Sequence, residues 1–446
     1  MITKSGYGIE KSKVPNVVQV KKLLTVKPYI PSVFVKPQYV TSYKVFNETD
    51  THIYVPKHFG IQNFGNVPED KLPVKTGDAF WEFKGAIRDS QKEVVNSYLC
   101  PEPRDGIISL QTGGGKTVCA LYIASRIGVP TIVLVHNTFL LDQWVDRISA
   151  FLPKARVGMI RGEIANVDDK DIVVAMLQSV ALKDYDKSVF EKFGMVIVDE
   201  CHHIASEAFS RAIPKLTCKH MLGLSATPER KDKLMYVINW FLGPILYKSD
   251  AADKVDSGVK VEVYEFATPD EEFNTIIYNS SGVMFTSLMV NKLVAFEERN
   301  AFINQIIQDV FEDETRQFLV LTDRVEHTET LMKNLPPELQ KNACILGRKV
   351  SSKDRAEFCE SKRILIATYQ MVKEGFDVAK LNTLVIATPR PDVEQIVGRI
   401  LRVQKEERKS DPLIIDIVDG MFRRQFQERL SLYRKRNYCV EKMEIK

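Results

Sequence analysis

Short aliphatic runs that alternate with helical stretches constrain the fold of this 446-residue chain more than any other feature. Between about residues 86 and 250 the runs are GIISL, TIVLV, DIVVAM, MVIVD and MLGLS, and after 251 they are QFLVLT, ACILG, RILIAT, TLVIAT and PLIIDIVD. Strands that are apolar on both faces, with helices between them, form parallel sheets that are covered on both sides. The pattern therefore predicts an α/β protein with two doubly wound parallel-sheet domains.

The segments outside these runs set the domain boundaries. Residues 1–85 are rich in Val, Tyr, Phe and Pro and contain short alternating runs such as YKVF and HIYV, which indicates a small β-rich accessory domain. The polar stretch 248–260 has no clear periodicity and is expected to be an interdomain linker. We therefore expect an N-terminal accessory domain over 1–85, a first α/β domain over 86–250, and a second over 251–446 that ends in a basic tail.

Composition narrows the class of protein. No apolar run reaches the ~18–20 residues that a membrane-spanning helix requires, and the N-terminus lacks the apolar core of a secretory signal. The seven cysteines are scattered and never spaced as CxxC, which is typical of a reduced intracellular protein. The expectation is a cytoplasmic protein without membrane contact.

Positive charge collects at both ends of the chain, although the net charge is only +4. Seven lysines and one acid occur up to Lys36, and the last 26 residues hold eight basic residues against three acids. Such ends are either solvated surface or contacts for a polyanion backbone. Phe and Tyr near the C-terminus either stack on nucleic-acid bases or belong to the core.

Residues 111–117 read QTGGGKT and lie between a predicted strand, GIISL, and a predicted helix, VCALYIASRIG. The three glycines allow a tight turn that aims backbone N–H groups inward, and the helix N-terminus adds positive potential. Lys116 can then reach the β- and γ-phosphates of a nucleotide, and Thr117 can offer its hydroxyl to Mg²⁺. Leu110 stands where the strict phosphate-loop pattern has glycine, but the strand–loop–helix context still indicates a phosphate loop.

Residues 199–203 read DECHH, and Asp199 follows the predicted strand MVIV at its carboxyl end, the edge where doubly wound sheets bind ligands. Asp199 is expected to hold Mg²⁺ directly or through water, and Glu200 to orient and deprotonate the attacking water. A zinc site is disfavoured because three consecutive residues cannot all point at one ion. A Cys–His nucleophile would leave the phosphate loop unexplained, so DECHH is interpreted as the second half of a nucleotide site.

Further motifs follow in order: IRDSQ (87–91), VLVHNTFLLDQW (133–144), MLQSV (176–180), SAT (225–227), LTDRVEHTETL (321–331), IATYQMVKEGFDV (366–378) and QIVGRILR (395–402). Together with QTGGGKT and DECHH they resemble the superfamily 2 helicases of the DExH type, with the closest likeness to the XPB-like and UvsW-like branch that includes viral and phage DNA helicases. The resemblance covers about residues 85–405. It implies two RecA-like domains that use ATP and Mg²⁺ to move along a nucleic-acid strand.

The resemblance also implies roles for individual residues. The ATP-binding set is Arg88, Gln91, Gln111, Thr112, Gly113, Gly114, Gly115, Lys116, Thr117, Gly375 and Asp377. The Mg²⁺ set is Thr117 and Asp199. The catalytic set is Lys116, Asp199, Glu200, Arg399 and Arg402, with Arg402 favoured as the arginine finger. The residues that couple hydrolysis to motion are His203, Ser225, Thr227 and Gln395. The nucleic-acid contacts are Thr138, Gln178, Arg324 and Thr368.

The expected activity is that of an ATP-dependent helicase or translocase that unwinds or remodels forked and branched DNA. We expect a monomer that binds single-stranded, forked or branched DNA in the cytoplasm, within a host cell if the source is viral, and works with replication or recombination proteins. Three alternatives stay open: an RNA helicase, a double-strand DNA translocase that separates no strands, and a nucleic-acid-binding module without ATPase activity. The intact Lys116, Thr117, Asp199 and Glu200 disfavour the last of these.

Overall fold

The computed structural model describes residues 1–29, 41–67, 71–72, 81–111, 113–203, 207–226, 233–249, 258–280, 282–347, 350, 352–373, 380–401 and 408–444. The chain divides into two compact units, Met1–Ser249 and Asp250–Lys446. None of the helices within the described ranges combines the length and the hydropathy that a bilayer span requires.

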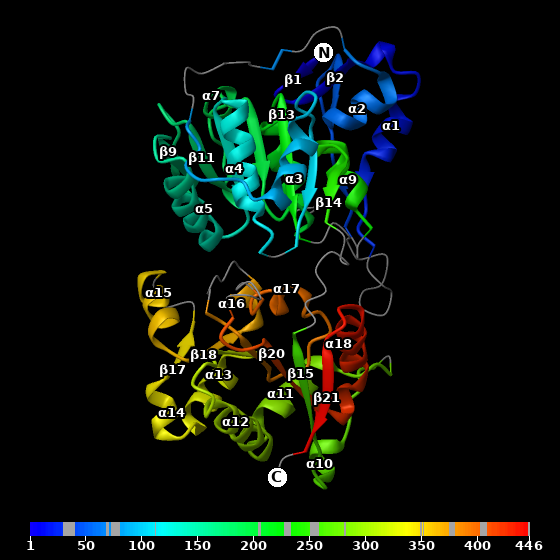
Figure 1. Ribbon diagram of the computed structural model, residues 1–446. Coiled ribbons are helices and arrows are strands. Elements are labelled where there is room, and N and C mark those ends of the chain that lie inside the picture. Colours follow the sequence, from blue (N-terminus) through cyan, green and yellow to red (C-terminus); the bar gives the residue numbers. More distant parts are fainter. Residues whose placement is uncertain are drawn as a thin grey trace. The chain divides into compact units, whose positions relative to one another are not determined.

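The described part of the first unit is built on an eight-stranded sheet with the strand order β10-β9-β11-β8-β12-β13-β7-β14 (Figure 1). Its strands are β7 (Gly106–Ser109), β8 (Thr131–Val135), β9 (Val157–Arg161), β10 (Ile164–Asn166), β11 (Ile172–Met176), β12 (Met195–Val198), β13 (His220–Ser225) and β14 (Ile245–Lys248). β9 and β10 pair antiparallel, and the other described neighbours pair parallel. Every aliphatic run predicted for this domain forms a strand, which confirms the parallel α/β fold.

Alternate residues of these strands pack on opposite faces of the sheet, as the period of a strand requires. On one face Ile108 and Val133 belong to a core with three helices. These helices are α3 (Asp89–Leu99), α4 (Lys116–Ile127) and α5 (Thr138–Phe151). On the other face Ile107 and Ile132 belong to a second core. The elements that cover this face include α6 (Leu177–Leu182), α7 (Ser188–Glu191), α8 (Glu207–Ala212), the short 3₁₀ segment η4 (Ile213–Lys215) and α9 (Met235–Leu242).

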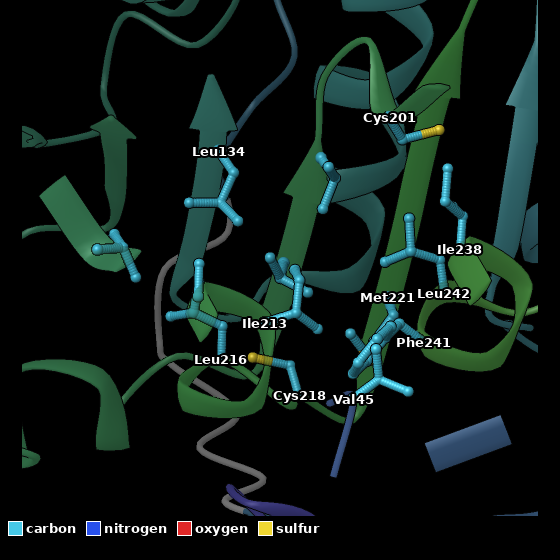
Figure 2. Packing of buried hydrophobic residues seen from close by; sticks show 14 of the residues in the cluster. Val45, Leu134, Cys201, Ile213, Leu216, Cys218, Met221, Ile238, Phe241 and Leu242 are labelled. Atoms are coloured by element: carbon cyan, nitrogen blue, oxygen red, sulfur yellow. The ribbon is translucent and has the colours of Figure 1, made fainter. Parts of the chain in front are cut away.

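The N-terminal residues pack onto this second face. Their described part contains an antiparallel sheet of the order β1-β2-β6-β5 and a two-stranded ribbon of β3 and β4. The elements are β1 (Ile2–Thr3), β2 (Gly6–Glu10), the 3₁₀ turn η1 (Lys11–Lys13), α1 (Val17–Leu23), β3 (Thr25–Val26), β4 (Tyr43–Lys44), β5 (Asn47–Glu48), β6 (His52–Val55) and α2 (Lys57–Phe64). Figure 2 shows Val45 beside Met221 and Phe241 of the sheet domain, and all three belong to one hydrophobic cluster.

A buried ion pair adds to this apolar contact. The ammonium of Lys57 lies 2.7 Å from a carboxylate oxygen of Asp105, which directly precedes β7. The same ammonium donates to the carbonyl of Cys218 at 3.2 Å. Breaking such a buried pair from one side costs about 3–5 kcal/mol, so the N-terminal segment is held firmly to the first unit.

In the described part of the second unit, a seven-stranded parallel sheet has the order β17-β18-β16-β19-β20-β15-β21. Its strands are β15 (Lys260–Phe266), β16 (Phe318–Thr322), β17 (Ala343–Leu346), β18 (Ile364–Thr368), β19 (Thr383–Ile386), β20 (Leu413–Asp419) and β21 (Cys439–Met443). The helices are α10 (Glu271–Asn274), α11 (Thr286–Ala295), α12 (Glu297–Phe311), α13 (Val325–Asn334), α14 (Pro337–Lys341), α15 (Ser352–Ser361), α16 (Tyr369–Lys373), α17 (Glu394–Val397) and α18 (Arg423–Lys435), with a 3₁₀ turn η6 (Gly420–Phe422) before α18.

The basic C-terminal segment is part of this fold, because it forms α18 and the edge strand β21. Arg429 is buried and its guanidinium donates to both oxygens of Asp416, at 2.9 and 2.7 Å. Phe422, Phe426 and Tyr433 are also buried. Of the two roles that the sequence left open for the aromatic residues of this segment, the structure supports the core role for Phe422, Phe426 and Tyr433.

Candidate nucleotide-binding site

The loop QTGGGKT lies between β7 and α4, and its backbone angles favour glycine at two positions. Gly113 and Gly115 have φ angles of +83° and +82°, in the left-handed region that glycine adopts without strain. A Cβ at position 115 would lie 2.1 Å from Nε2 of Gln91, so any larger residue there would displace the Gln91 amide from the loop. The backbone N–H of Gly114 donates to the carbonyl of Gln111 at 3.0 Å and closes the turn. The result is a backbone cradle of the kind that holds phosphate.

The predicted lysine and acid of the site are neighbours. Nζ of Lys116, the first residue of α4, lies 3.2 Å from Oε1 of Glu200, which follows β12. Both side chains are partly buried, with exposed fractions of 12% and 23%. Glu200 has a φ of +45°, which is rare for a residue other than glycine. Such backbone strain costs of order 1–3 kcal/mol and is concentrated at functional sites.

Asp199 is buried and its carboxylate is held from two sides. The indole N–H of Trp144 donates to Oδ2 at 2.8 Å, and the backbone N–H of Glu200 donates to Oδ1 at 2.9 Å. Burial, followed by the nearby Glu200 carboxylate, raises the pKa of Asp199 to about 6. A cation beside this carboxylate would favour the charged form and lower the pKa again.

The residues present fit a magnesium nucleotide. Thr117 in the first turn of α4 and Asp199 after β12 offer the hydroxyl and carboxylate oxygens that Mg²⁺ prefers. The glycine cradle and Lys116 suit phosphate oxygens. Cys201 instead packs in the apolar core near Ile238 and Leu242 (Figure 2). That placement supports a core role for the thiol of DECHH.

A histidine that the sequence analysis missed connects SAT to the acid pair. Nδ1 of His202 lies 2.9 Å from Oγ of Ser225 and 3.4 Å from Oε2 of Glu200. The backbone N–H of Ala226 donates to the same Glu200 oxygen at 3.3 Å. The signal that could have identified His202 is its spacing, two positions after the acid, which is the D-E-x-H pattern itself.

The adenine-side candidates are tied to the phosphate loop. Gln91 is buried, and its Nε2 donates to the carbonyl of Gly114 at 3.4 Å. The backbone N–H of Arg88 donates to Oε1 of Gln91 at 3.1 Å, while the Arg88 side chain is exposed. Both residues stand at the start of α3, so this helix is joined directly to the cradle.

The nucleic-acid candidates of each unit follow the carboxyl ends of neighbouring strands. In the first unit, Nε2 of Gln178 in α6 donates to the carbonyl of His136 at 2.9 Å, close to Thr138 at the start of α5. In the second unit, Thr368 ends β18, and Arg324 directly precedes α13. Arg324 also donates to Oδ1 of Asn291 at 2.7 Å and to the Ser287 hydroxyl at 3.0 Å, so α11 fixes its guanidinium.

The structure describes only some of the remaining candidate residues. Arg399 is half-buried, and its Nη2 donates to the carbonyl of Val372 at 3.4 Å. Five candidates lie outside the described residues: Thr112, Thr227, Gly375, Asp377 and Arg402. The side chains of His203 and Gln395 lie outside them as well.

Three comparisons with known proteins bear on the site and the fold. The family model described as "Type III restriction enzyme, res subunit" matches residues 84–230. The chain is 31% identical over 462 residues to a protein of Acanthamoeba polyphaga mimivirus named "Putative ATP-dependent RNA helicase", and the match covers 100% of this chain and 87% of the relative. It is 26% identical over 343 residues to the "Probable helicase" of Escherichia phage T5, covering 74% of this chain and 72% of that protein. The solved structure of S. cerevisiae Dbp5 bound to RNA and ADP BeF3 gives a TM-score of 0.54 at 14% identity, with 79% of this chain and 88% of that chain covered, which shows a shared fold.

A phosphate loop and an acid pair at the carboxyl edge of one parallel sheet, followed by a second parallel sheet, define a class of protein with two RecA-like domains. Within that class, this chain belongs to the superfamily 2 helicases of the viral and phage type. Membership in this family implies ATP-dependent action on nucleic acid.

Proposed function

We propose that this helicase is a nucleic-acid-stimulated ATPase that unwinds or remodels forked and branched DNA. The observation that carries the ATPase assignment is the 3.2 Å contact between Lys116 of the phosphate loop and Glu200 of DECHH. A lysine that binds phosphate and an acid that activates water must both reach the γ-phosphate, and this contact supports such an arrangement.

The first unit is proposed to bind the nucleotide. Backbone N–H groups of the loop from Gln111 to Gly115, with Thr112 among them, hold the phosphates, and Lys116 contacts the β- and γ-phosphates. Arg88 and Gln91 contact the adenine side. Thr117 and Asp199 hold Mg²⁺, which when bound neutralises charge on the phosphates. Glu200 orients the attacking water and accepts its proton.

The second unit is proposed to supply the remaining catalytic groups. Gly375 and Asp377 lie near the nucleotide, and Arg399 and Arg402 provide the positive charge that stabilises the transition state, with Arg402 as the finger. An arginine finger contributes about 10³–10⁵ in rate. Ser225, His202, His203, Thr227 and Gln395 form the proposed link between hydrolysis and motion.

The strand is proposed to contact Thr138, Gln178, Arg324 and Thr368 through its phosphate backbone. Such contacts are independent of sequence and sensitive to salt.

Residues 1–85 are proposed as an accessory domain, 86–250 as the first motor domain and 251–446 as the second. We propose that the protein acts as a monomer in the interior of a host cell, with replication or recombination proteins as its partners.

DNA is the proposed track because the motifs of the chain resemble the XPB-like and UvsW-like branch of helicases, and the family model over residues 84–230 is described as a restriction-enzyme subunit. A second candidate is RNA, which the printed name of the mimivirus relative favours. The proposed strand contacts are made to the nucleic-acid backbone and do not distinguish DNA from RNA. The choice between the two tracks therefore depends on a direct measurement.

The test is the ATPase rate without nucleic acid and with single-stranded DNA, forked DNA, a four-way junction, duplex DNA and RNA, together with strand displacement on the same substrates. Glu200→Gln is the control and should lose about 10²–10⁴ in rate, because it cannot accept a proton. Strongest stimulation and displacement on forks and junctions would support the proposal. Stimulation by RNA alone would replace DNA with RNA, and stimulation by duplex without displacement would make the protein a translocase.

A further inference from the structure

Trp144 makes the least expected contact of the nucleotide site. It lies in the second turn of α5, is only 1% exposed, and belongs to the core between α3, α4, α5 and the sheet. Its indole N–H donates to Oδ2 of Asp199 at 2.8 Å. Most buried indole N–H groups have a hydrogen-bond partner, and for Trp144 the partner is the carboxylate that the proposed function gives to Mg²⁺.

The second oxygen of Asp199 is held from another direction. Oδ1 accepts the backbone N–H of Glu200 at 2.9 Å, and the backbone N–H of Asp199 itself donates to the carbonyl of Leu134 in β8 at 3.0 Å. Two donors, one on each oxygen, fix the plane of the carboxylate. Because each carboxylate oxygen accepts two hydrogen bonds or ligands, a lone pair remains on each oxygen for a metal ion or its water.

We propose that Trp144 is a positioning residue for the metal-binding carboxylate of Asp199. Its N–H sets the orientation in which the remaining lone pairs meet Mg²⁺, and it does not touch the nucleotide. Groups that hold a metal ligand in this way typically contribute about 10–100-fold in metal affinity. The inference rests on the proposed function, because it assumes that Asp199 holds Mg²⁺.

Trp144→Phe removes the N–H and keeps an aromatic ring in the core. The matched control is Trp81→Phe, because Trp81 belongs to the same hydrophobic cluster, is 3% exposed, and has an indole N–H without a partner among the described residues. Both substitutions remove the same atoms from the same core, but only Trp144→Phe also removes a hydrogen bond, which adds to its cost in stability. Urea unfolding of each variant shows that both remain folded under the conditions of the binding measurement.

The readout is binding of a fluorescent ADP analogue to the full chain over a Mg²⁺ titration, with EDTA as the baseline. Trp144→Phe should shift the Mg²⁺ midpoint upward by about 10–100-fold, while affinity for the nucleotide in EDTA stays at the wild-type value. Trp81→Phe should leave the midpoint unchanged. A benzothienyl analogue of tryptophan at position 144 keeps the shape of the ring without the N–H and should reproduce the shift even if phenylalanine disturbs folding.

An unchanged Mg²⁺ midpoint in Trp144→Phe and in the benzothienyl variant would overturn the inference, as would an equal shift in Trp81→Phe. Asp199→Asn separates this failure from failure of the proposed function. If Asp199→Asn loses the Mg²⁺ dependence and the Trp144 variants keep the wild-type midpoint, only the role of Trp144 is wrong. If Asp199→Asn keeps the wild-type Mg²⁺ dependence, the metal assignment is wrong and the role of Trp144 falls with it.

Discussion

Glu200 is the residue at which the contacts of the nucleotide site converge. Its two carboxylate oxygens meet the ammonium of Lys116, the backbone N–H of Ala226 and the ring of His202. His202 in turn bonds the hydroxyl of Ser225. The acid that is proposed to activate water is therefore joined through one histidine to the SAT segment. We expect a substitution at Ser225 to affect the environment of Glu200, and a substitution at Glu200 to affect that of Ser225.

This network predicts a non-additive pair of substitutions. Ser225→Ala and His202→Ala should each lower nucleic-acid-stimulated ATP hydrolysis by roughly 2–13-fold, because each removes a hydrogen bond worth about 0.5–1.5 kcal/mol. The double variant should be no slower than the slower single variant, since partners in one network do not add. ATPase rates at saturating nucleotide measure the effect. Fully multiplicative losses would show that the two residues act independently.

The environment of His202 shows where sequence reasoning stops. The D-E-x-H spacing could have identified this histidine, but it does not predict that the ring lies against Ser225. Glu200 leaves the strand with φ +45°, and a 3₁₀ turn over Cys201–His203 follows. That turn buries Cys201 in the core and brings His202 to Ser225. No pattern in one sequence specifies such a local reversal.

A second buried histidine predicts a pH dependence of stability. Nε2 of His327 lies 2.8 Å from Oδ1 of Asn300, and Nδ1 lies 2.6 Å from Oγ1 of Thr322. Burial, followed by the Arg299 cation, lowers the pKa of His327 to about 3. The unfolded histidine titrates near about 6.5. Between these values the unfolded state binds more protons, so stability falls as the pH falls through this window.

The free energy of unfolding of the wild type should therefore drop by up to about 1.4 kcal/mol per pH unit from this group. Urea unfolding between pH 7 and 5 measures the slope, and pH 5 lies above most carboxylate titrations. His327→Gln removes the titrating group and should flatten that slope. An identical slope in the variant would mean that His327 is protonated in the folded protein.

At the scale of elements, α18 converts part of a basic segment into core structure. Arg429→Ala should destabilise the protein by about 3–5 kcal/mol, because it leaves the buried carboxylate of Asp416 without its cation. Arg434→Ala on the exposed face of the same helix is the matched control and should change stability by no more than about 0.5 kcal/mol. Urea unfolding of both variants tests the difference. Equal, small effects would contradict the buried ion pair.

Strands formed by mostly apolar runs could be predicted from the sequence, whereas β15 and β21, in which charged and apolar residues are mixed, were not predicted. GIISL and TIVLV read directly as buried strands and are β7 and β8. β15 (Lys260–Phe266) carries Lys260, Glu262 and Glu265, yet it lies between β20 and β21 with Val261 and Val263 buried in the core. Lys260 also pairs with Glu441 of β21, and a single sequence does not show such a contact between segments far apart in the chain.

The whole molecule separates its proposed catalytic groups between two units. Lys116, Asp199 and Glu200 belong to Met1–Ser249, and Arg399 and Arg402 belong to Asp250–Lys446. The first unit has its own sheet with one hydrophobic cluster on each face, and the Lys57–Asp105 ion pair attaches its N-terminal segment. It therefore has the contacts that an independently folding fragment requires.

A fragment of residues 1–249 should fold and bind a magnesium nucleotide. It should hydrolyse ATP at least about 10³-fold more slowly than the full chain with nucleic acid, because it lacks the proposed arginine finger. Nucleotide affinity and ATPase rate, measured for both proteins, test this separation of binding from catalysis. In the full chain, Arg402→Ala should reproduce most of the loss with nucleotide affinity retained, and Arg399→Ala shows how much the second arginine contributes. A fragment that hydrolyses ATP at the stimulated rate of the full chain would place all of the catalytic groups in the first unit.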